Sequence, residues 1–178
     1  MTGKIHVIVG MSTLSMLCLK CPGGFEMFGT TIYPFIGLFT ATAGSYAPDI
    51  DLGRTHEGQK HKVASTVISK VGGGHRGITH TLLVPVICMV LMYMTYSKFY
   101  YNQMLCSTLM SLLFGWLFGY GMHLVADLFN GKGIPLFWPV FRTKVHIMDI
   151  ESNGWQAWAW LVVYLALAFF FIFRPNLY

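Results

Sequence analysis

Seven side chains of the types that bind divalent metal ions lie near the ends of apolar segments in this chain. They are His6, Asp49, Asp51, His75, His80, His123 and Asp127. Mixed imidazole and carboxylate ligands suit Zn²⁺, with Mn²⁺ and Fe²⁺ as alternatives. Seven candidates exceed one tetrahedral shell, so the pattern predicts two ions, or one ion whose ligands are supported by the remaining residues. Such a centre would provide activated water for hydrolysis near neutral pH.

The pair His123 and Asp127 has the spacing of two residues on one face of a helix, one turn apart. Both lie inside otherwise apolar sequence, where ionisable groups are costly and usually face a partner or a polar cavity. The alternative is a hydrogen bond within the helix that only orients it.

A glycine-rich stretch, GGGHRGITH at residues 72–80, contains two histidines five residues apart. We expect His80 in the first turn of a helix, capped by Thr79, and His75 on the preceding loop. Arg76 is suited to hold an anionic substrate oxygen, because a guanidinium group binds phosphate through two hydrogen bonds. The alternative is that both histidines are loop residues in the lipid headgroup layer.

Two carboxylates, Asp49 and Asp51, follow the second apolar segment. In the extended loop expected there they would repel each other without a cation between them. Asp51 or Asp127, if left unligated, would serve as the general base of a hydrolase. His6 is a weak signal by itself and gains value from its position on the same side as the others.

The composition predicts an all-α integral membrane protein. Apolar residues make up 54% of the chain and charged residues only 11%, against about 25% in soluble domains. Lys4 and the apolar run after it resemble a signal peptide, but no cleavage site of the usual type follows, so we interpret this run as a retained first helix. The prediction is one polytopic domain over residues 1–178 with about five transmembrane helices, at about 5–19, 31–47, 80–97, 105–127 and 155–173.

Threading these segments through a bilayer divides the basic residues unequally. Three lie on one side, at Lys20, Lys98 and Arg174. Nine lie on the other, at Lys4, Arg54, Lys60, Lys62, Lys70, Arg76, Lys132, Arg142 and Lys144. The excess predicts that the N-terminus, both long loops and the metal-ligand residues are cytoplasmic. It also accounts for the net charge of +5 without nucleic acid as a partner, since an anionic lipid surface suffices.

Other polar residues carry weaker signals. Cys18 and Cys21 have the CxxC spacing of some metal and redox sites, but no second CxxC accompanies them and they fall on the opposite side. Glu151 precedes the last segment and could approach the site. We interpret the remaining acids and histidines of the long loops as solvated, namely His56, Glu57, His61, His146 and Asp149.

The order of these motifs resembles the YdjM-type (DUF457) bacterial inner-membrane proteins, a LexA-regulated family to which metal-dependent hydrolase activity is ascribed. The likeness lies in PDID at 48–51, GHRGITHTL at 74–82, GYGMHLVAD at 119–127 and GIPLFWP at 133–139. It implies an inner-membrane location and a metal site made by all seven ligand residues. The family often carries Glu near the start of the last helix, where this chain has Gln156.

The leading hypothesis is therefore a membrane hydrolase that attacks a phosphoester of a lipid or lipid-linked substrate, with Arg76 and Lys60, Lys62 or Lys144 attracting phosphate. The alternative is a metal-binding transporter or sensor without hydrolytic activity. It would need polar residues across the bilayer, and the fourth and fifth segments offer mainly Ser107, Thr108 and Ser111. A third hypothesis is a structural protein whose polar residues only pack helix ends. The sequence does not specify an oligomeric state.

Overall fold

A computed structural model describes residues 3–51, 77–141, 143–151 and 154–174, and within them the chain is mostly helical. Five α-helices are present in this part, as the sequence predicts: α1 (Gly3–Lys20), α2 (Pro34–Tyr46), α5 (Leu83–Phe99), α6 (Gln103–Leu128) and α7 (Trp155–Phe173). Two strands, β1 (Phe25–Met27) and β2 (Thr30–Ile32), form an antiparallel hairpin. Two short 3₁₀ helices, η1 (Ala47–Asp51) and η2 (Ile78–His80), follow α2 and precede α5.

Local sequence explains where two of the helices begin. Pro34 occupies the first turn of α2, where its missing N–H costs no hydrogen bond. The helix therefore starts three residues later than the predicted residue 31, and Thr31 belongs to β2 instead. Asn102 caps α6, because its side-chain oxygen accepts a hydrogen bond from the Leu105 N–H at 3.1 Å.

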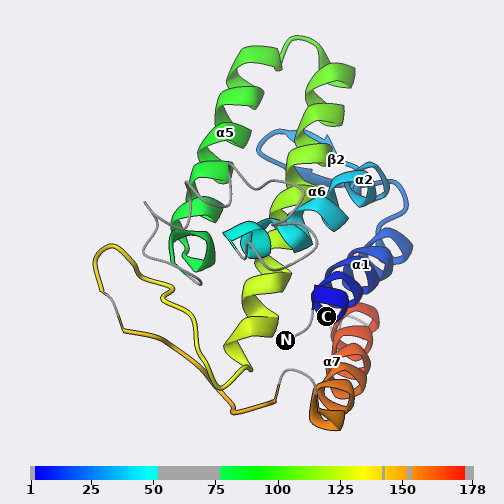
Figure 1. Cartoon of the computed structure of the whole chain (residues 1–178). Coiled ribbons are helices and arrows are strands. Elements are labelled where there is room, and N and C mark those ends of the chain that lie inside the picture. Colours follow the sequence, from blue (N-terminus) through cyan, green and yellow to red (C-terminus); the bar gives the residue numbers. More distant parts are fainter. Residues whose placement is uncertain (1–2, 52–76, 142, 152–153, 175–178) are drawn as a thin grey trace.

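Helix α6 is the centre of the bundle. It packs against α1, α2 and α5, and α7 packs against α1. Figure 1 shows α5 and α6 as a long antiparallel pair, with α1 and α7 beside each other on one side. The helices alternate in direction, so residues far apart in sequence meet at each end of the bundle.

The contact between α2 and α6 is a seam of small residues. A Cβ on Gly115 would lie 2.0 Å from the Gly37 carbonyl oxygen, and a Cβ on Gly119 would lie 2.1 Å from the Ala41 carbonyl oxygen. The two backbones therefore touch, which only glycine permits at these positions. The G-x-x-x-G spacing of Gly115 and Gly119 is typical of helix pairs packed within membranes. This seam fixes the end of α2, and hence η1, against α6.

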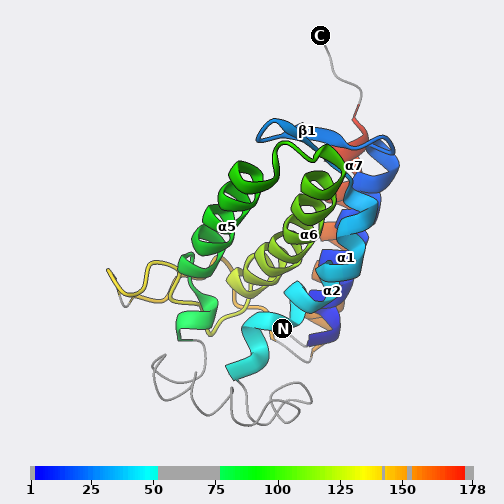
Figure 2. The same ribbon diagram turned by 90° about the horizontal axis from the view of Figure 1, so that it is seen from above.

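The two ends of the bundle differ in structure. Figure 2 shows the β-hairpin and the α5–α6 turn at one end, and the start of α1 with η1 at the other. The second end also receives the connection after α6, which is tied to α6 by hydrogen bonds from Ile147 N–H to Leu128 O (2.7 Å) and from Ile150 N–H to Phe129 O (3.1 Å).

Two of the described helices, α6 and α7, are long and apolar enough to cross a membrane, and α5 is a shorter apolar helix. Large apolar side chains cover the outer faces of α5 and α7. They include Val86, Ile87, Val90, Val162, Leu167 and Phe170, each about half exposed or more. An apolar face of this kind is suited to contact with lipid.

Candidate metal centre

The last turns of α6 supply an imidazole and a carboxylate to one buried point. His123 and Asp127 are four residues apart on the helix, with exposed fractions of 0% and 1%. The Nε2 atom of His123 lies 3.7 Å from Oδ2 of Asp127. Burial of a carboxylate at a helix C-terminus is doubly unfavourable, because it loses water and faces the negative end of the helix dipole. A positive partner at this point would offset both costs.

Helix α1 brings the third side chain. Its first turns pack against α6, which buries His6 to 1% exposure. The Nε2 atom of His6 lies 3.4 Å from Oδ1 of Asp127. The His6 and His123 rings are stacked, with centroids 3.7 Å apart and planes 15° apart. A single histidine near the N-terminus is therefore part of the same buried group.

The two 3₁₀ helices complete the group from opposite directions. Asp49 lies in η1, a 3₁₀ helix where the sequence analysis expected an extended loop. His80 ends η2, before α5, where we expected the first turn of the helix itself. The Nε2 atoms of His80 and His123 lie 3.9 Å and 3.8 Å from Oδ1 of Asp49. His80 Nε2 also lies 3.4 Å from Oδ2 of Asp127.

We call these five residues the His–Asp cluster; they are His6, Asp49, His80, His123 and Asp127. The cluster contains two groups of three residues. One group is His6, His123 and Asp127, and the other is Asp49, His80 and His123. Within each group, one nitrogen or oxygen atom per residue lies within 4.8 Å of the other two.

The separations fit metal ligands better than they fit direct hydrogen bonds. The five nitrogen–oxygen distances run from 3.4 to 3.9 Å. Hydrogen bonds are usually about 2.7–3.2 Å long, whereas two ligands at about 2.1 Å from one tetrahedral ion lie about 3.4 Å apart. Within the described residues, Nε2 of His123, which faces both carboxylates, is buried and has no hydrogen-bond partner. Nδ1 of His6 is also buried without a partner, but the His6 nitrogen that faces Asp127 is Nε2. With neutral imidazoles the cluster carries two negative charges, which favours the binding of divalent cations.

One backbone contact determines which nitrogen of His123 is available. The Nδ1 atom of His123 lies 2.7 Å from the Ser45 carbonyl oxygen. A carbonyl only accepts, so Nδ1–H donates and the Nε2 lone pair faces the cluster. Metal-binding histidines commonly use their second nitrogen in this manner. The Ser45 carbonyl is the last-turn backbone of α2, and the small-residue seam places it there.

A second contact positions η2. The Tyr120 hydroxyl donates a hydrogen bond to the Thr79 carbonyl, one residue before His80. Tyr120 is 2% exposed and packs against Trp116, which keeps the hydroxyl in place. Contrary to the prediction, Thr79 does not cap α5. The hydroxyl of Thr81 accepts the Leu83 N–H at 3.2 Å instead, and Thr79 Oγ1 lies 3.1 Å from His80 Nδ1.

The roles of Ser45, Tyr120 and the glycine seam were not predicted from the sequence. The G-x-x-x-G spacing in α6 was visible and would have predicted a close helix partner. Nothing in the sequence indicates that the Ser45 carbonyl would face His123, because that contact depends on the crossing of α2 and α6.

Several predicted site residues are not placed by the structure. His75 and Arg76 lie outside the described residues, as do Lys60 and Lys62. Asp51 ends η1, and its side chain lies outside the described part. Glu151 is exposed rather than in the cluster, and its backbone N–H donates to the Gln156 side-chain oxygen at 3.4 Å. His146 and Asp149 form an exposed pair 3.6 Å apart, as expected of solvated loop residues.

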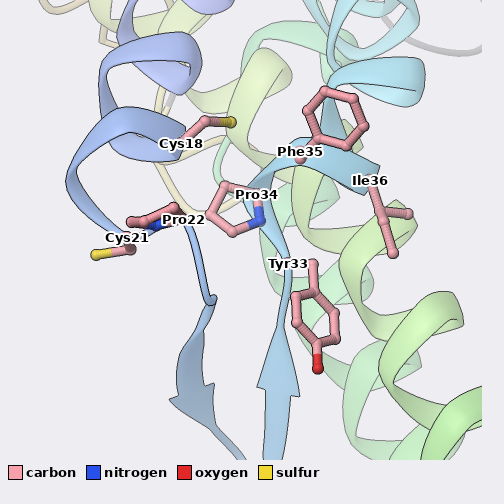
Figure 3. A pocket seen from close by; sticks show the side chains of 7 residues that line it. All are labelled: Cys18, Cys21, Pro22, Tyr33, Pro34, Phe35 and Ile36. Carbon is pink, nitrogen blue, oxygen red and sulfur yellow. The ribbon is translucent and has the colours of Figure 1, made fainter.

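The CxxC residues are far from the cluster, at the β-hairpin end of the bundle. Both thiols are free. They lie beside a pocket of about 330 Å³ between the end of α1 and the start of α2, and Figure 3 shows their sulfur atoms pointing in different directions. Its other lining residues are Pro22, Tyr33, Pro34, Phe35 and Ile36. This pocket contributes nothing to the His–Asp cluster.

Comparison with known proteins gives a family for the whole arrangement. The chain is 33% identical over 108 residues to the inner membrane protein YdjM of Escherichia coli (strain K12) and to that of Shigella flexneri. The match covers 60% of this chain and 52% of each relative, so it spans about half the length of these curated relatives. YvsG of Bacillus subtilis (strain 168) is 28% identical over 139 residues, which is 78% of this chain and 74% of YvsG.

No solved structure matches the chain. The family model described as "YdjM inner membrane protein" matches residues 1–177. This match covers the helices, the cluster and both connections. The chain therefore belongs to the YdjM family of inner membrane proteins.

Proposed function

We propose that this inner membrane protein is a metal-dependent hydrolase that cleaves a phosphoester of a lipid or lipid-linked substrate. The observation that carries the proposal is the His–Asp cluster: three imidazoles and two carboxylates from four chain segments, converging at 3.4–3.9 Å. Zn²⁺ is the ion that best suits this ligand set, with Mn²⁺ and Fe²⁺ as alternatives.

The position of the cluster supports a lipid substrate. His123 and Asp127 lie in the last turns of α6, one of the two described helices that are long and apolar enough to cross a membrane, and α7 begins at the same end. A site at a helix end is at the level of lipid headgroups, where a phosphoester is available without a channel for a soluble substrate. The sequence has its excess of basic residues near the N-terminus and in the two long connections, which supports a cytoplasmic position for this side.

We further propose that all five helices contribute to a multi-pass arrangement. Helices α1 and α5 have 18 and 17 residues, which corresponds to about 27 and 26 Å of length. Helix α2 has 13 residues, or about 20 Å, and is too short to cross alone. The β-hairpin before it and η1 after it would make up the remaining thickness while packed against α6.

Each group in the cluster has a distinct role in this proposal. A bound divalent ion would acidify a coordinated water and polarise a phosphoryl oxygen. The imidazoles and carboxylates hold the ion, and the Ser45 carbonyl orients His123 toward it. Asp51, or Asp127 if it is left unligated, would accept the proton from water, and Arg76 would bind the phosphate. These last roles rest on the sequence.

A transporter is less well supported, because the hydroxyls that α6 could offer for a path, those of Ser107, Thr108 and Ser111, are already hydrogen-bonded. Ser111 Oγ donates to Ser107 O at 2.6 Å and accepts the Tyr33 N–H at 2.9 Å. Thr40 Oγ1 donates to Leu112 O at 2.6 Å. These hydroxyls join helices to one another, so they do not form a row of ligands for a passing ion.

The test uses the full chain purified in detergent. Its metal content is measured first, and hydrolysis of phospholipid and polyprenyl-phosphate panels is then measured with and without added Zn²⁺ or Mn²⁺. We expect metal-dependent release of product by the wild type and at least a hundredfold loss in His80→Ala. His146→Ala, which removes an exposed histidine outside the cluster, is the matched control and should retain full activity. Equal inactivity of the metal-loaded wild type and His80→Ala on every substrate would contradict the proposal.

A further inference from the structure

The orientations of the three imidazole rings determine how many ions the His–Asp cluster can hold. A metal ion bound by imidazole lies close to the ring plane, along the lone pair of the nitrogen. Rings that share one ion must therefore have planes that intersect near it. This condition separates the three histidines into two groups.

His80 and His123 can share an ion. Their planes are inclined at 67°, with centroids 5.4 Å apart, so their lone pairs can meet at one point. Both Nε2 atoms face the same two carboxylate oxygens. They lie 3.9 and 3.8 Å from Oδ1 of Asp49, and 3.4 and 3.7 Å from Oδ2 of Asp127.

His6 and His123 cannot share an ion in this geometry. Their rings are nearly parallel, at 15°, and stacked with centroids 3.7 Å apart. An ion between two such rings would lie about 1.7 Å out of each plane, against a metal–nitrogen bond of only about 2.0–2.1 Å. Nor can His123 serve two ions, because its Nδ1–H donates to the Ser45 carbonyl and only Nε2 is left.

The carboxylate of Asp127 connects the two groups. Its Oδ1 lies 3.4 Å from His6 Nε2, and its Oδ2 lies 3.4 Å from His80 Nε2. Each oxygen thus faces a different imidazole. In two-metal hydrolases a carboxylate shared between the ions is a common arrangement of ligands.

We propose that the cluster binds two divalent ions, one held by Asp49, His80 and His123, the other by His6, with Asp127 bridging them. The inference rests on the proposed metal-dependent function and adds the number of ions and the ligands of each. It assigns His6 a ligand role of its own. The competing arrangement has one ion, with His6 only donating a hydrogen bond to Asp127.

The experiment counts Mn²⁺ ions and detects their coupling. The full chain in detergent is stripped of metal, titrated with Mn²⁺, and analysed by elemental analysis and electron paramagnetic resonance. We expect two Mn²⁺ per chain and an exchange-coupled signal in the wild type. We expect one Mn²⁺ with the signal of an isolated ion in His6→Ala. The control His146→Ala should keep two coupled ions.

The outcomes separate this inference from the proposed function. One ion per wild-type chain, without coupling, would overturn the two-ion arrangement and leave a one-metal hydrolase intact. Absence of any bound ion, with Zn²⁺ as well as Mn²⁺, would overturn both. The wild-type count and its coupling decide the question even if His6→Ala fails to fold, and His6→Asn provides a second variant of the same position.

Discussion

Buried polar groups at the two ends of the bundle differ in their hydrogen bonding. At the β-hairpin end, Ser107, Ser111 and the Tyr33 N–H are linked by hydrogen bonds, with 2.9 Å between Tyr33 N and Ser111 Oγ. At the other end, the His–Asp cluster has separations of 3.4–3.9 Å and buried ring nitrogens without a hydrogen-bond partner among the described residues. Thr30 Oγ1 is the exception at the hairpin end.

We interpret the difference as one between polar groups that hold a structure together and polar groups that could hold a metal ion. Buried donors and acceptors normally find partners, because each one left unmade costs about 1–3 kcal/mol. The hairpin end follows this rule with short side chains that bond to backbone carbonyls. The cluster end departs from it with residues that are the common ligands of metal ions.

The largest effect should come from a substitution in the α2–α6 seam, which would disturb both ends of the bundle at once. In Gly119→Leu the new Cβ would lie only 2.1 Å from the Ala41 carbonyl oxygen, which is a severe clash. The two backbones cannot move apart to relieve it without breaking the seam. We expect a loss of several kcal/mol, enough to prevent recovery of folded protein. Yield and helix content after purification measure it. Gly121→Ala, where a Cβ meets nothing within 4 Å, is the control and should fold normally.

The next effect should be confined to the cluster end. Asp127→Ala removes both carboxylate oxygens that face His6, His80 and His123. We expect loss of bound metal and of hydrolysis while the helices remain folded. Elemental analysis and helix content measure these. Retention of metal by Asp127→Ala at the wild-type level would show that this carboxylate is not a ligand.

Metal removal should destabilise only proteins that bind metal. An ion that binds only the folded protein stabilises it, and the gain grows with the logarithm of the ion concentration divided by its Kd. Chelation should therefore lower the Tm of the wild type by several degrees. The Tm of Asp127→Ala should not change on chelation. An equal shift in both proteins would mean that the chelator acts elsewhere.

A smaller effect should follow from removing the hydrogen bond that positions η2. Tyr120→Phe removes the hydroxyl that donates to the Thr79 carbonyl beside His80, and leaves the packing on Trp116. Since such supporting contacts are typically worth 10- to 100-fold in metal affinity, we expect about a tenfold weaker Kd for metal. Competition with a chelator of known affinity measures it. Unchanged affinity would show that η2 holds its position without this bond.

The smallest effect should appear at the hairpin end. Ser111→Ala leaves the Tyr33 N–H without its acceptor, so we expect the free energy of unfolding to fall by about 1–3 kcal/mol. Metal content should not change, because the cluster lies at the other end. Thr108→Ala removes an exposed hydroxyl that bonds only within α6 and should shift stability by less than about 0.5 kcal/mol. Loss of metal in Ser111→Ala would mean that the two ends are coupled.

The helices and the residue types available for chemistry could be predicted from the sequence. Long apolar runs leave few alternatives to a helix, so five helices were predicted, and the helix at 155–173 matches α7 at both ends. The spacing of His123 and Asp127 placed both on one face of α6, because a helix repeats every 3.6 residues. The small β-hairpin was missed, since Gly23, Gly24 and Gly29 indicate turns but not pairing.

Which of these residues meet, and in what orientation, depends on how the helices pack and could not be predicted from the sequence. His6 stacks on His123 because α1 packs against α6, a relation that no spacing within either segment contains. The tautomer of His123 depends on the Ser45 carbonyl, which the close approach of α2 and α6 brings within 2.7 Å. Helix crossings set the ring planes, the lone-pair directions and the carbonyl positions. The number of ions that the cluster can hold therefore depends on the packing and not only on which ligand residues are present.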